Sequence, residues 1–283
     1  MKNLVGKSVW LTLTLASSAL AGLTSGTVTL DGKVIQYQAY SGTSAASYQQ
    51  FLQGANLVNF ESVPGVTAEA VNSYNSATTT AANLIDPKTA INGAYFSAGG
   101  QTPGNPANGG NPAGLVDVSA LNGAHSGKNV LGPTAQGDPT EPLDFNNGFI
   151  SVNFQLNQPI SRFGWWTNPN GGKVAFPPHM NTFDSSDNMV DLSAGLTFTA
   201  NPGDFVAFAF DSAVINEVEL FQGGPMTVDD FTFARDKTLP FGSSVTSTVP
   251  EPASWTLSIL GIGIGLLSLF WVRRTPRNRP AAS

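Results

Sequence analysis

The chain has 283 residues, with no cysteine and two histidines, and its 13 basic and 19 acidic residues give a formal charge of −6. Six basic residues and one acidic residue lie at the two ends, so residues 22–250 carry 7 basic and 18 acidic residues, a net charge of −11. This balance argues against a nucleic-acid-binding protein, which needs a basic face to replace the counterions of phosphate. The missing cysteines exclude disulfides, thiolate metal sites and a cysteine nucleophile.

The N-terminus has the three parts of a secretory signal peptide. Lys2 and Lys7 form a short basic region, and a mostly apolar run covers residues 9–16. Ala19 and Ala21 then form the A-x-A pattern that signal peptidase cleaves. The apolar run is too short to cross a bilayer, which disfavours an uncleaved anchor. We expect cleavage after Ala21 and export of the remaining chain, so residues 1–21 are the predicted signal peptide.

The exported body begins with a predicted β-hairpin. Apolar and polar residues alternate over residues 27–30 and 33–37, which is the pattern of half-buried strands. The Asp-Gly pair at 31–32 accepts the positive φ values of a two-residue hairpin turn. Residues 47–52 are predicted as a short helical turn, and residues 57–61 as a further strand.

Residues 99–114 form a low-complexity loop rich in Gly, Pro and Asn. Its few apolar groups offset little of its ordering entropy, which favours a disordered insertion. The alternative is a surface loop that contacts a ligand, as some long loops do. Before it, residues 67–85 are rich in Ala, Asn, Ser and Thr and give no definite structural prediction.

Strand signals become dense from residue 149 onward. Candidate strands, separated by turn residues, cover residues 150–156, 160–166, 174–176, 181–183, 189–192, 196–198, 205–210, 214–221 and 228–234. Residues 205–210 are apolar on both faces, as in a central strand. Short strands at this spacing, with no helical pattern between them, predict an all-β protein whose residues 22–248 form one antiparallel β-sandwich.

The segment from residue 149 to 235 is similar to the jelly-roll domains of the galactose-binding-like and carbohydrate-binding group. The residues that carry this resemblance are Phe154, 162–166 (Arg-Phe-Gly-Trp-Trp), 183–188, 205–210, 215–220 and 228–233, with 59–61 as the first strand. The resemblance implies a jelly-roll-like sandwich in which the first and last strands are neighbours. The chain before residue 59 and the loop at 99–114 do not fit it.

The same resemblance implies a structural calcium ion held by Glu61, Asp229 and Asp230. Glu61 ends the expected first strand, and the two aspartates open the last one. Calcium prefers several oxygen ligands, and carboxylates supply them. The alternative is that all three are solvated residues at strand ends. Because residues alternate along a strand, at most one of the two aspartates shares the sheet face of Phe231.

Trp165 and Trp166 are the candidate ligand-binding residues, as a platform for a glycan. Aromatic faces pack on the apolar side of sugar rings, and Asn168, Asn170 and His179 carry groups that bind hydroxyls. Adjacent strand residues point to opposite faces, so only one indole is available as a platform. Packing of both indoles in the core is the alternative.

No catalytic constellation stands out in the sequence. His125 lies in Gly-Ala-His-Ser-Gly, which resembles a loop, and no Gly-x-Ser-x-Gly occurs. Two carboxylates can serve a glycosidase, but with 18 in the body any chosen pair is uninformative. The sequence therefore favours a protein that is not an enzyme, with a secreted glycoside hydrolase as the weaker alternative.

The C-terminus has three parts in a fixed order. The first is the motif Val249, Pro250, Glu251 and Pro252. Residues 253–272 follow without a charge and, at 1.5 Å per helical residue, are long enough to cross a ~30 Å hydrocarbon core. The third part is a basic tail over residues 273–279, with Arg273, Arg274, Arg277 and Arg279. By the positive-inside rule this tail stays cytoplasmic, and the body faces outward.

Together these three parts closely resemble the PEP-CTERM sorting signal, over residues 249–279. The resemblance implies a Gram-negative bacterium with an exopolysaccharide-producing envelope. It also implies transient anchoring in the inner membrane, processing near Pro-Glu-Pro by an exosortase, and release or attachment at the cell surface or in the matrix. The alternative is an ordinary membrane protein with one span.

The expected function follows from the two resemblances. We expect an exported surface or matrix protein that binds glycan or adheres, without catalysis, and that meets signal peptidase, an exosortase and an extracellular polysaccharide. The alternative is a purely structural matrix component without a defined ligand.

Overall fold

The computed structural model describes residues 22–74, 80, 82–134, 143, 145–146 and 148–241. The expected signal peptide (1–21) and sorting segment (249–279) lie outside this part of the chain. Contacts divide the chain into two compact units, Met1–Phe241 and Gly242–Ser283, and all described residues belong to the first. Within the described residues, no helix is long and apolar enough to cross a membrane.

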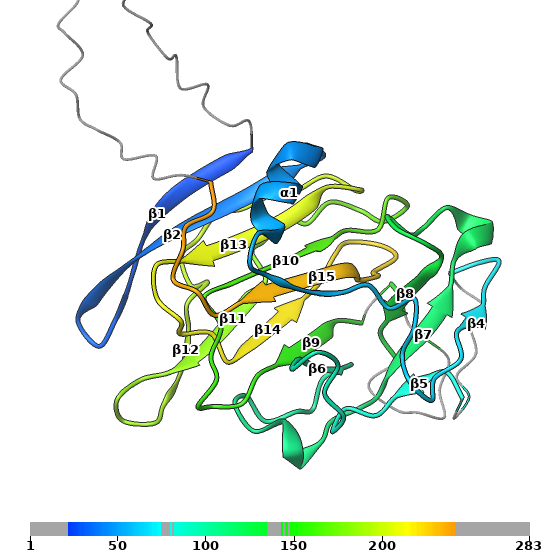
Figure 1. The fold of residues 1–283 in the computed structure, drawn as a ribbon, viewed down its shortest axis with the longest axis horizontal. Coiled ribbons are helices and arrows are strands. Elements are labelled where there is room, and N and C mark those ends of the chain that lie inside the picture. Colours follow the sequence, from blue (N-terminus) through cyan, green and yellow to red (C-terminus); the bar gives the residue numbers. More distant parts are fainter. Residues whose placement is uncertain are drawn as a thin grey trace, which may run out of the picture. The chain divides into compact units, whose positions relative to one another are not determined.

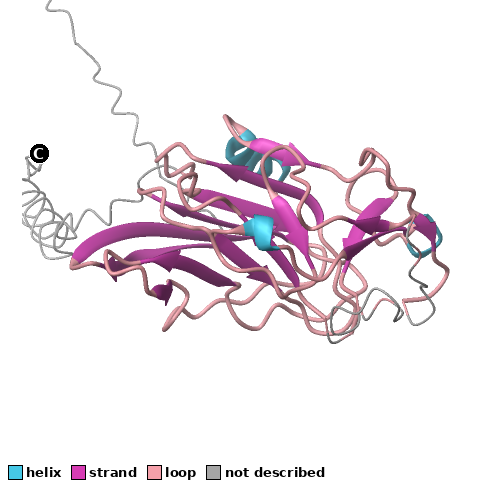
Figure 2. Ribbon diagram, turned by 90° about the horizontal axis from the view of Figure 1, so that it is seen from below, coloured by secondary structure: helices cyan, strands magenta, loops and turns pink. Residues whose placement is uncertain are grey.

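Two antiparallel sheets form the body, which confirms the all-β sandwich expected from the sequence (Figure 1 and Figure 2). The six-stranded sheet has the order β1 (Leu23–Leu30), β2 (Lys33–Gly42), β13 (Phe205–Phe210), β10 (Arg162–Trp166), β15 (Asp229–Ala234) and β3 (Asn56–Val58). The five-stranded sheet has the order β12 (Met189–Asp191), β11 (His179–Phe183), β14 (Glu217–Leu220), β9 (Ile150–Asn153) and β6 (Tyr95–Ser97).

A small third sheet and three short helices complete the described elements. The sheet has the order β4 (Glu69–Ala70), β7 (Ala113–Asp117) and β5 (Leu84–Ile85), with β8 (Asn129–Gly132) also paired to β7. The helices are α1 (Ala45–Leu52), η1 (Pro106–Asn108) and η2 (Ser119–Leu121). Strands β4 and β7 run parallel, so this sheet departs from the antiparallel pattern. Its shortest strands span two residues, too few to show an alternating pattern in the sequence.

An apolar core fills the space between the two large sheets. Side-chain alternation directs Phe163 and Phe208 from the six-stranded sheet, and Val152, Met180 and Val218 from the five-stranded sheet, into one buried cluster. Burying each such side chain contributes about 1.5–3 kcal/mol, so this layer is a large contribution to the stability of the sandwich. Strand β13 is buried along its whole length, as its apolar sequence predicts.

A second apolar cluster lies on the opposite face of the six-stranded sheet, beneath α1 (Figure 1). The helix begins at the N-cap Ser44, whose hydroxyl accepts a hydrogen bond from the backbone N–H of Ser47 at 3.3 Å. It buries Tyr48 and Phe51, and both rings pack edge-on against Phe205 of β13. The predicted helical turn is confirmed, and it covers this face of the sheet.

The first hairpin is confirmed with its turn. Leu30 pairs with Lys33, and Asp31 and Gly32 take φ values of 50° and 71°. Two other predictions are wrong: residues 174–176 and 196–198 form no strands. Instead, Val174 makes an isolated bridge with Ala200. The residues on either side of this bridge lie in turns and irregular segments, so no strand forms.

The expected first strand lies beside the last, as the sequence resemblance implies. In this pairing Val58 of β3 faces Phe231 of β15. The strand ends at Val58, earlier than predicted, because Phe60 turns into the left-handed region with φ 57°.

The loop at 99–114 has a defined path, unlike the disordered insertion that its composition favours. Backbone hydrogen bonds of 2.8 Å join Ala98 to Asn111 and Asn111 to Gly99. Gln101 is buried, and its amide donates to the carbonyl oxygen of Pro87 at 2.6 Å. Polar contacts therefore order a loop that has few apolar groups, and its last two residues already belong to β7.

Candidate functional site

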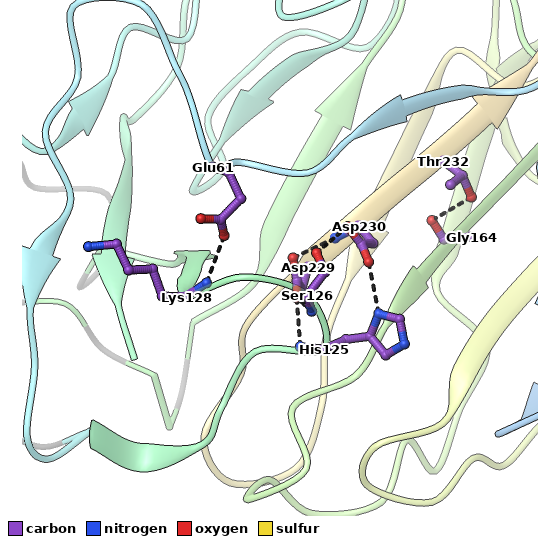
Figure 3. A network of polar contacts seen from close by, with 8 residues as sticks. All are labelled: Glu61, His125, Ser126, Lys128, Gly164, Asp229, Asp230 and Thr232. Carbon is purple, nitrogen blue, oxygen red and sulfur yellow. Dashed lines mark hydrogen bonds and ion pairs between the residues drawn. The ribbon is translucent and has the colours of Figure 1, made fainter. Parts of the chain in front are cut away.

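The three carboxylates singled out by the sequence all contact one short segment, residues 125–129 (Figure 3). Asp229 Oδ2 accepts the backbone N–H groups of His125 and Ser126 at 2.7 and 2.9 Å. The carboxylate of Asp230 contacts the side chains of the same two residues. Its Oδ2 lies 2.8 Å from His125 Nδ1, and its Oδ1 accepts the hydroxyl of Ser126 at 2.8 Å. Glu61 Oε1 accepts the backbone N–H groups that follow, from residues 128 and 129, at 2.9 and 2.8 Å.

A β-bulge lets both aspartates reach that segment. Asp229 pairs with Trp166 and Thr232 pairs with Gly164, so two residues of β15 oppose one residue of β10. The first bulge residue, Asp230, has φ 47°, in the left-handed region that few non-glycine residues adopt. Strict alternation would separate two consecutive side chains, and the sequence carries no signal for this exception.

Burial makes the charge of Asp229 sensitive to pH. Its side chain is 2% exposed, and burial together with the neighbouring Asp230 raises the pKa of Asp229 to about 7, against the lowering effect of its backbone N–H donors. Burial, reinforced by the charge of Asp230, also raises the pKa of Tyr48. Near neutral pH the carboxyl group of Asp229 is therefore only partly ionised.

The calcium ion expected here stays a prediction. The oxygens that would bind it face N–H and O–H donors of residues 125–129. Within the described part of the chain, no group of three or more His, Asp or Glu residues is placed to hold a metal ion. A calcium ion bound by these oxygens would have to replace the N–H and O–H donors that they now accept. Their contacts instead fix the segment between η2 and β8 to the sandwich.

Both tryptophans of the predicted platform are buried. Trp165 is 0% exposed and belongs to the core between the sheets. Trp166 points to the other face, is 6% exposed, and packs against the edge of Tyr48. The imidazole of His125 stacks on its indole with 3.6 Å between ring centroids and 6° between planes. A sugar can stack on Trp166 only after His125 leaves, so the structure shows the core packing that the sequence left open.

The polar neighbours proposed for that platform have other partners. Asn168 is buried, and its side-chain oxygen accepts hydrogen bonds from the Tyr74 hydroxyl at 3.2 Å and the backbone N–H of Asn170 at 2.9 Å. The side-chain amide of Asn170 donates to the carbonyl oxygen of Leu121 at 2.9 Å. His179 lies on β11 of the five-stranded sheet, with its ring edge-on to Phe221.

A groove of about 400 Å³ lies where the loop at 99–114 meets the chain after β9. Its main side chains are Lys88, Tyr95, Asn105, Gln155, Leu156 and Asn157. Tyr95 is half-buried, whereas Leu156 is 53% exposed, a high value for an apolar residue. The groove therefore combines an aromatic ring and an exposed aliphatic side chain with three amide groups.

Backbone contacts of β6, β9 and the loop build this groove. Tyr95 pairs with Asn153, which positions the following residues 155–157 beside the tyrosine ring. Gln155 donates its amide to the Tyr95 hydroxyl at 3.3 Å. Leu156 donates its backbone N–H to the carbonyl oxygen of Gly104 at 2.8 Å and so joins the two walls. Gly104 has φ 72°, and a side chain there would begin 3.0 Å from the ring of Phe183.

A row of polar side chains leads from the groove across the five-stranded sheet. Register and alternation place Tyr95, Asn153, Glu217, Asn181 and Asp191 next to one another on its outward face. Glu217 is 3% exposed and accepts hydrogen bonds from neutral groups, including the amides of Asn153 and Asn181 at 3.2 and 2.9 Å. The amide oxygen of Asn153 is buried and has no hydrogen-bond partner among the described residues.

Another depression, of about 460 Å³, lies between residues 58–66 and 84–92. The aromatic ring among its lining residues is Phe60, which is buried in the core. The described lining of this depression therefore offers no exposed ring on which a sugar could stack.

Comparison with known proteins adds no identification: no family model, no curated protein and no solved structure matches the chain. The residues of the groove were not singled out by the sequence. The one indication in the sequence was the loop at 99–114, for which contact with a ligand was the alternative interpretation.

Proposed function

We propose that this protein is an exported surface or matrix protein whose sandwich body binds a polysaccharide, without catalysis, in the groove at Tyr95. The observation that carries the proposal is the composition of this groove, in which Tyr95 and the exposed Leu156 lie among the amides of Asn105, Gln155 and Asn157.

These residue types match the surface of a sugar. A pyranose ring has an apolar face, which packs on aromatic and aliphatic side chains, and a rim of hydroxyl groups that both donate and accept hydrogen bonds. An amide side chain also donates and accepts, so three amides can bind hydroxyls in many orientations. Pockets that bind small ligands combine such apolar surfaces with a few polar groups.

The expected ends of the chain give this groove its setting. A signal peptide over residues 1–21 and a sorting segment over 249–279, resembling PEP-CTERM, would bring the body through the inner membrane and then to the cell surface or matrix. There the partner with the right chemistry is an extracellular polysaccharide. Signal peptidase and an exosortase are the proposed processing partners, and the jelly-roll likeness and the calcium ion remain part of this proposal.

A structural matrix component without a ligand is the second candidate. The burial of Trp165 and Trp166 favours it, because a glycan-binding surface usually presents its largest aromatic rings. The groove at Tyr95 favours the glycan-binding candidate, because a spacer has no need of an aromatic and amide-lined groove.

The test is a polysaccharide-binding screen of the full chain in detergent, with and without calcium, that includes the exopolysaccharide of the producing organism. We expect saturable binding that falls at least tenfold in Tyr95→Ala and persists in Tyr95→Phe. Phe176→Ala is the matched control, since this ring is 68% exposed and lies outside the groove. No binding by the folded wild-type protein, or equal binding by Tyr95→Ala, would leave the structural role as the better account.

A further inference from the structure

We infer that the groove at Tyr95 takes an acidic glycan, one whose sugar units carry carboxylate groups, and that the ammonium group of Lys88 selects it. This inference rests on the proposed function and names its ligand class.

The first observation is a contrast of charge. Residues 22–250 carry 18 acidic and 7 basic residues, yet the described lining of the groove contains Lys88 and no carboxylate. Charge interactions are screened over about 8 Å at physiological ionic strength. A ligand in the groove therefore experiences Lys88, which lines it, more strongly than any carboxylate that lies beyond this distance.

The second observation is that Lys88 has no acidic partner within the part of the chain that the structure describes. Lys128 and Arg162 pair with Asp117 and Asp236 at 2.8 and 3.2 Å, whereas Lys88 makes no ion pair with any described residue. Its nearest acidic neighbour in sequence is Asp86, which lines the other depression.

The carboxylate of Asp86 is engaged in its own turn. One oxygen accepts the backbone N–H of Lys88 at 2.9 Å, and the other accepts the hydroxyl of Thr89 at 3.0 Å. These bonds hold the backbone of Lys88 in place and leave its ammonium group for a ligand. The nearest carboxylate of the polar row, Glu217, is buried behind Asn153.

The third observation is that the long loop positions the lysine side chain. Gly109 has φ 76°, and a side chain at this position would begin 2.6 Å from Cε of Lys88. The aliphatic stem of Lys88 thus passes closely over a glycine of the loop that forms one wall of the groove. Only glycine accommodates both the backbone conformation and this approach.

The chemistry of these contacts favours a carboxylate over a hydroxyl. An ammonium group donates up to three hydrogen bonds, and its bonds to an ionised acceptor are shorter and stronger than those to a neutral one. The ring of each sugar unit packs on Tyr95 and Leu156, and the amides bind its hydroxyls. Lys88 then distinguishes a sugar acid from its neutral counterpart.

The test compares polygalacturonate with the same polymer after chemical reduction of its carboxyl groups, which leaves ring and linkage unchanged. The full chain in detergent is titrated with both. We expect at least fivefold tighter binding of the acidic polymer at low salt. Lys88→Gln should lose this preference, Lys88→Arg should keep it, and added salt should weaken binding of the acidic polymer alone.

The outcomes separate this inference from the proposed function. Equal affinity for both polymers, with Lys88→Gln like the wild type and Tyr95→Ala deficient for both, overturns the acidic specificity and retains the glycan site. Binding of neither polymer overturns the inference as well, and the polysaccharide screen then decides the proposed function. Equal melting temperatures of the Lys88 variants and the wild type show that any lost preference is not a folding defect.

Discussion

Asp229 and Asp230 show how two adjacent carboxylates are accommodated in a buried place. Each accepts hydrogen bonds from the same two residues, His125 and Ser126, one through the backbone and one through the side chains. Such bonds to a charged acceptor contribute about 1.5–3 kcal/mol each and offset part of the cost of burial. The part of the cost of burial that these bonds do not offset raises the pKa of Asp229, together with the charge of Asp230.

This raised pKa predicts that stability falls as the pH rises from about 4 to about 7. In the unfolded chain an aspartate has a pKa near 3.9, roughly three units lower, so between these values the folded state binds more protons and its stability decreases with pH. At about 1.4 kcal/mol per unit the loss is on the order of 4 kcal/mol. Urea unfolding of the wild type and Asp229→Asn at pH 5 and pH 8 measures it. We expect a smaller difference between the two pH values in the variant, and an unchanged difference contradicts this explanation.

Asp230 is expected to be more important for stability than a surface aspartate. Asp230→Ala loses two hydrogen bonds and leaves a residue with less tolerance for φ 47° in the bulge, so we expect a loss of about 2–4 kcal/mol. Asp230→Asn keeps much of the bonding and tolerates the left-handed region, and should lose less. Chemical denaturation at pH 8 checks the order. Equal stability of the alanine variant and the wild type would show that these bonds are not needed.

The sequence identified the group of Glu61, Asp229 and Asp230 but not what they bind. Their place at the ends of neighbouring strands was implied by the resemblance to jelly-roll domains, and the pairing of β3 with β15 agrees with it. Their common contact with residues 125–129 depends on the bulge and on a loop far away in sequence, and no local pattern encodes either. Tyr95 was missed for a related reason, because β6 spans three residues and its groove forms only when the long loop folds against it.

Helix α1 is the element that closes the outer face of the six-stranded sheet. Phe51 is fully buried among Phe205, Phe241 and the guanidinium of Arg162, which lies 5.5 Å from its ring centroid. Burial lowers the pKa of Arg162, opposed by the charge of Asp236. The helix thus covers both an aromatic cluster and a buried cation.

Removing the ring of Phe51 should open this face. We expect Phe51→Ala to destabilise the protein by about 3–5 kcal/mol, the usual loss for a buried phenylalanine. Gln49→Ala is the matched control, because Gln49 is exposed on the same helix and its replacement should change stability by less than about 0.5 kcal/mol. Thermal and urea unfolding of the two variants measure both effects. A similar small change in both would mean that α1 does not stabilise the sheet.

Strand β13 could be predicted from the sequence, whereas the ordered path of the loop at 99–114 could not. Strand β13 is apolar on both faces, so its central, fully buried place follows from composition alone. The loop has no such pattern, and its order comes from partners outside it, among them Pro87 and Asn153 for the buried Gln101. Short strands such as β4 and β5 were missed because two residues define no period.

For the molecule as a whole, the sandwich belongs to one of the two compact units. This unit ends at Phe241, and its apolar clusters consist of residues between Leu23 and Phe241. We predict that residues 22–241 fold alone, with one cooperative thermal transition at the same temperature as in the full chain. A fragment that aggregates or melts without cooperativity would show that the remaining residues are required.

The calcium prediction also concerns the whole folded body. If the ion is part of this body, added calcium should raise the melting temperature of the full chain above that in excess chelator, and Glu61→Gln should reduce the rise. If the hydrogen bonds of Glu61 to residues 128 and 129 are its whole role, the melting temperature is the same with calcium and with chelator. Differential scanning calorimetry distinguishes these results.

Polysaccharide binding in the groove at Tyr95 is the proposal on which the function of the whole protein depends. Hydrogen exchange of the full chain in detergent, with and without the exopolysaccharide of the producing organism, is its decisive test. We predict slower exchange confined to residues 95–107 and 153–158, and no such change in Tyr95→Ala. Unchanged exchange in these two segments, or protection elsewhere such as residues 162–168 at the tryptophan pair, would contradict the proposal.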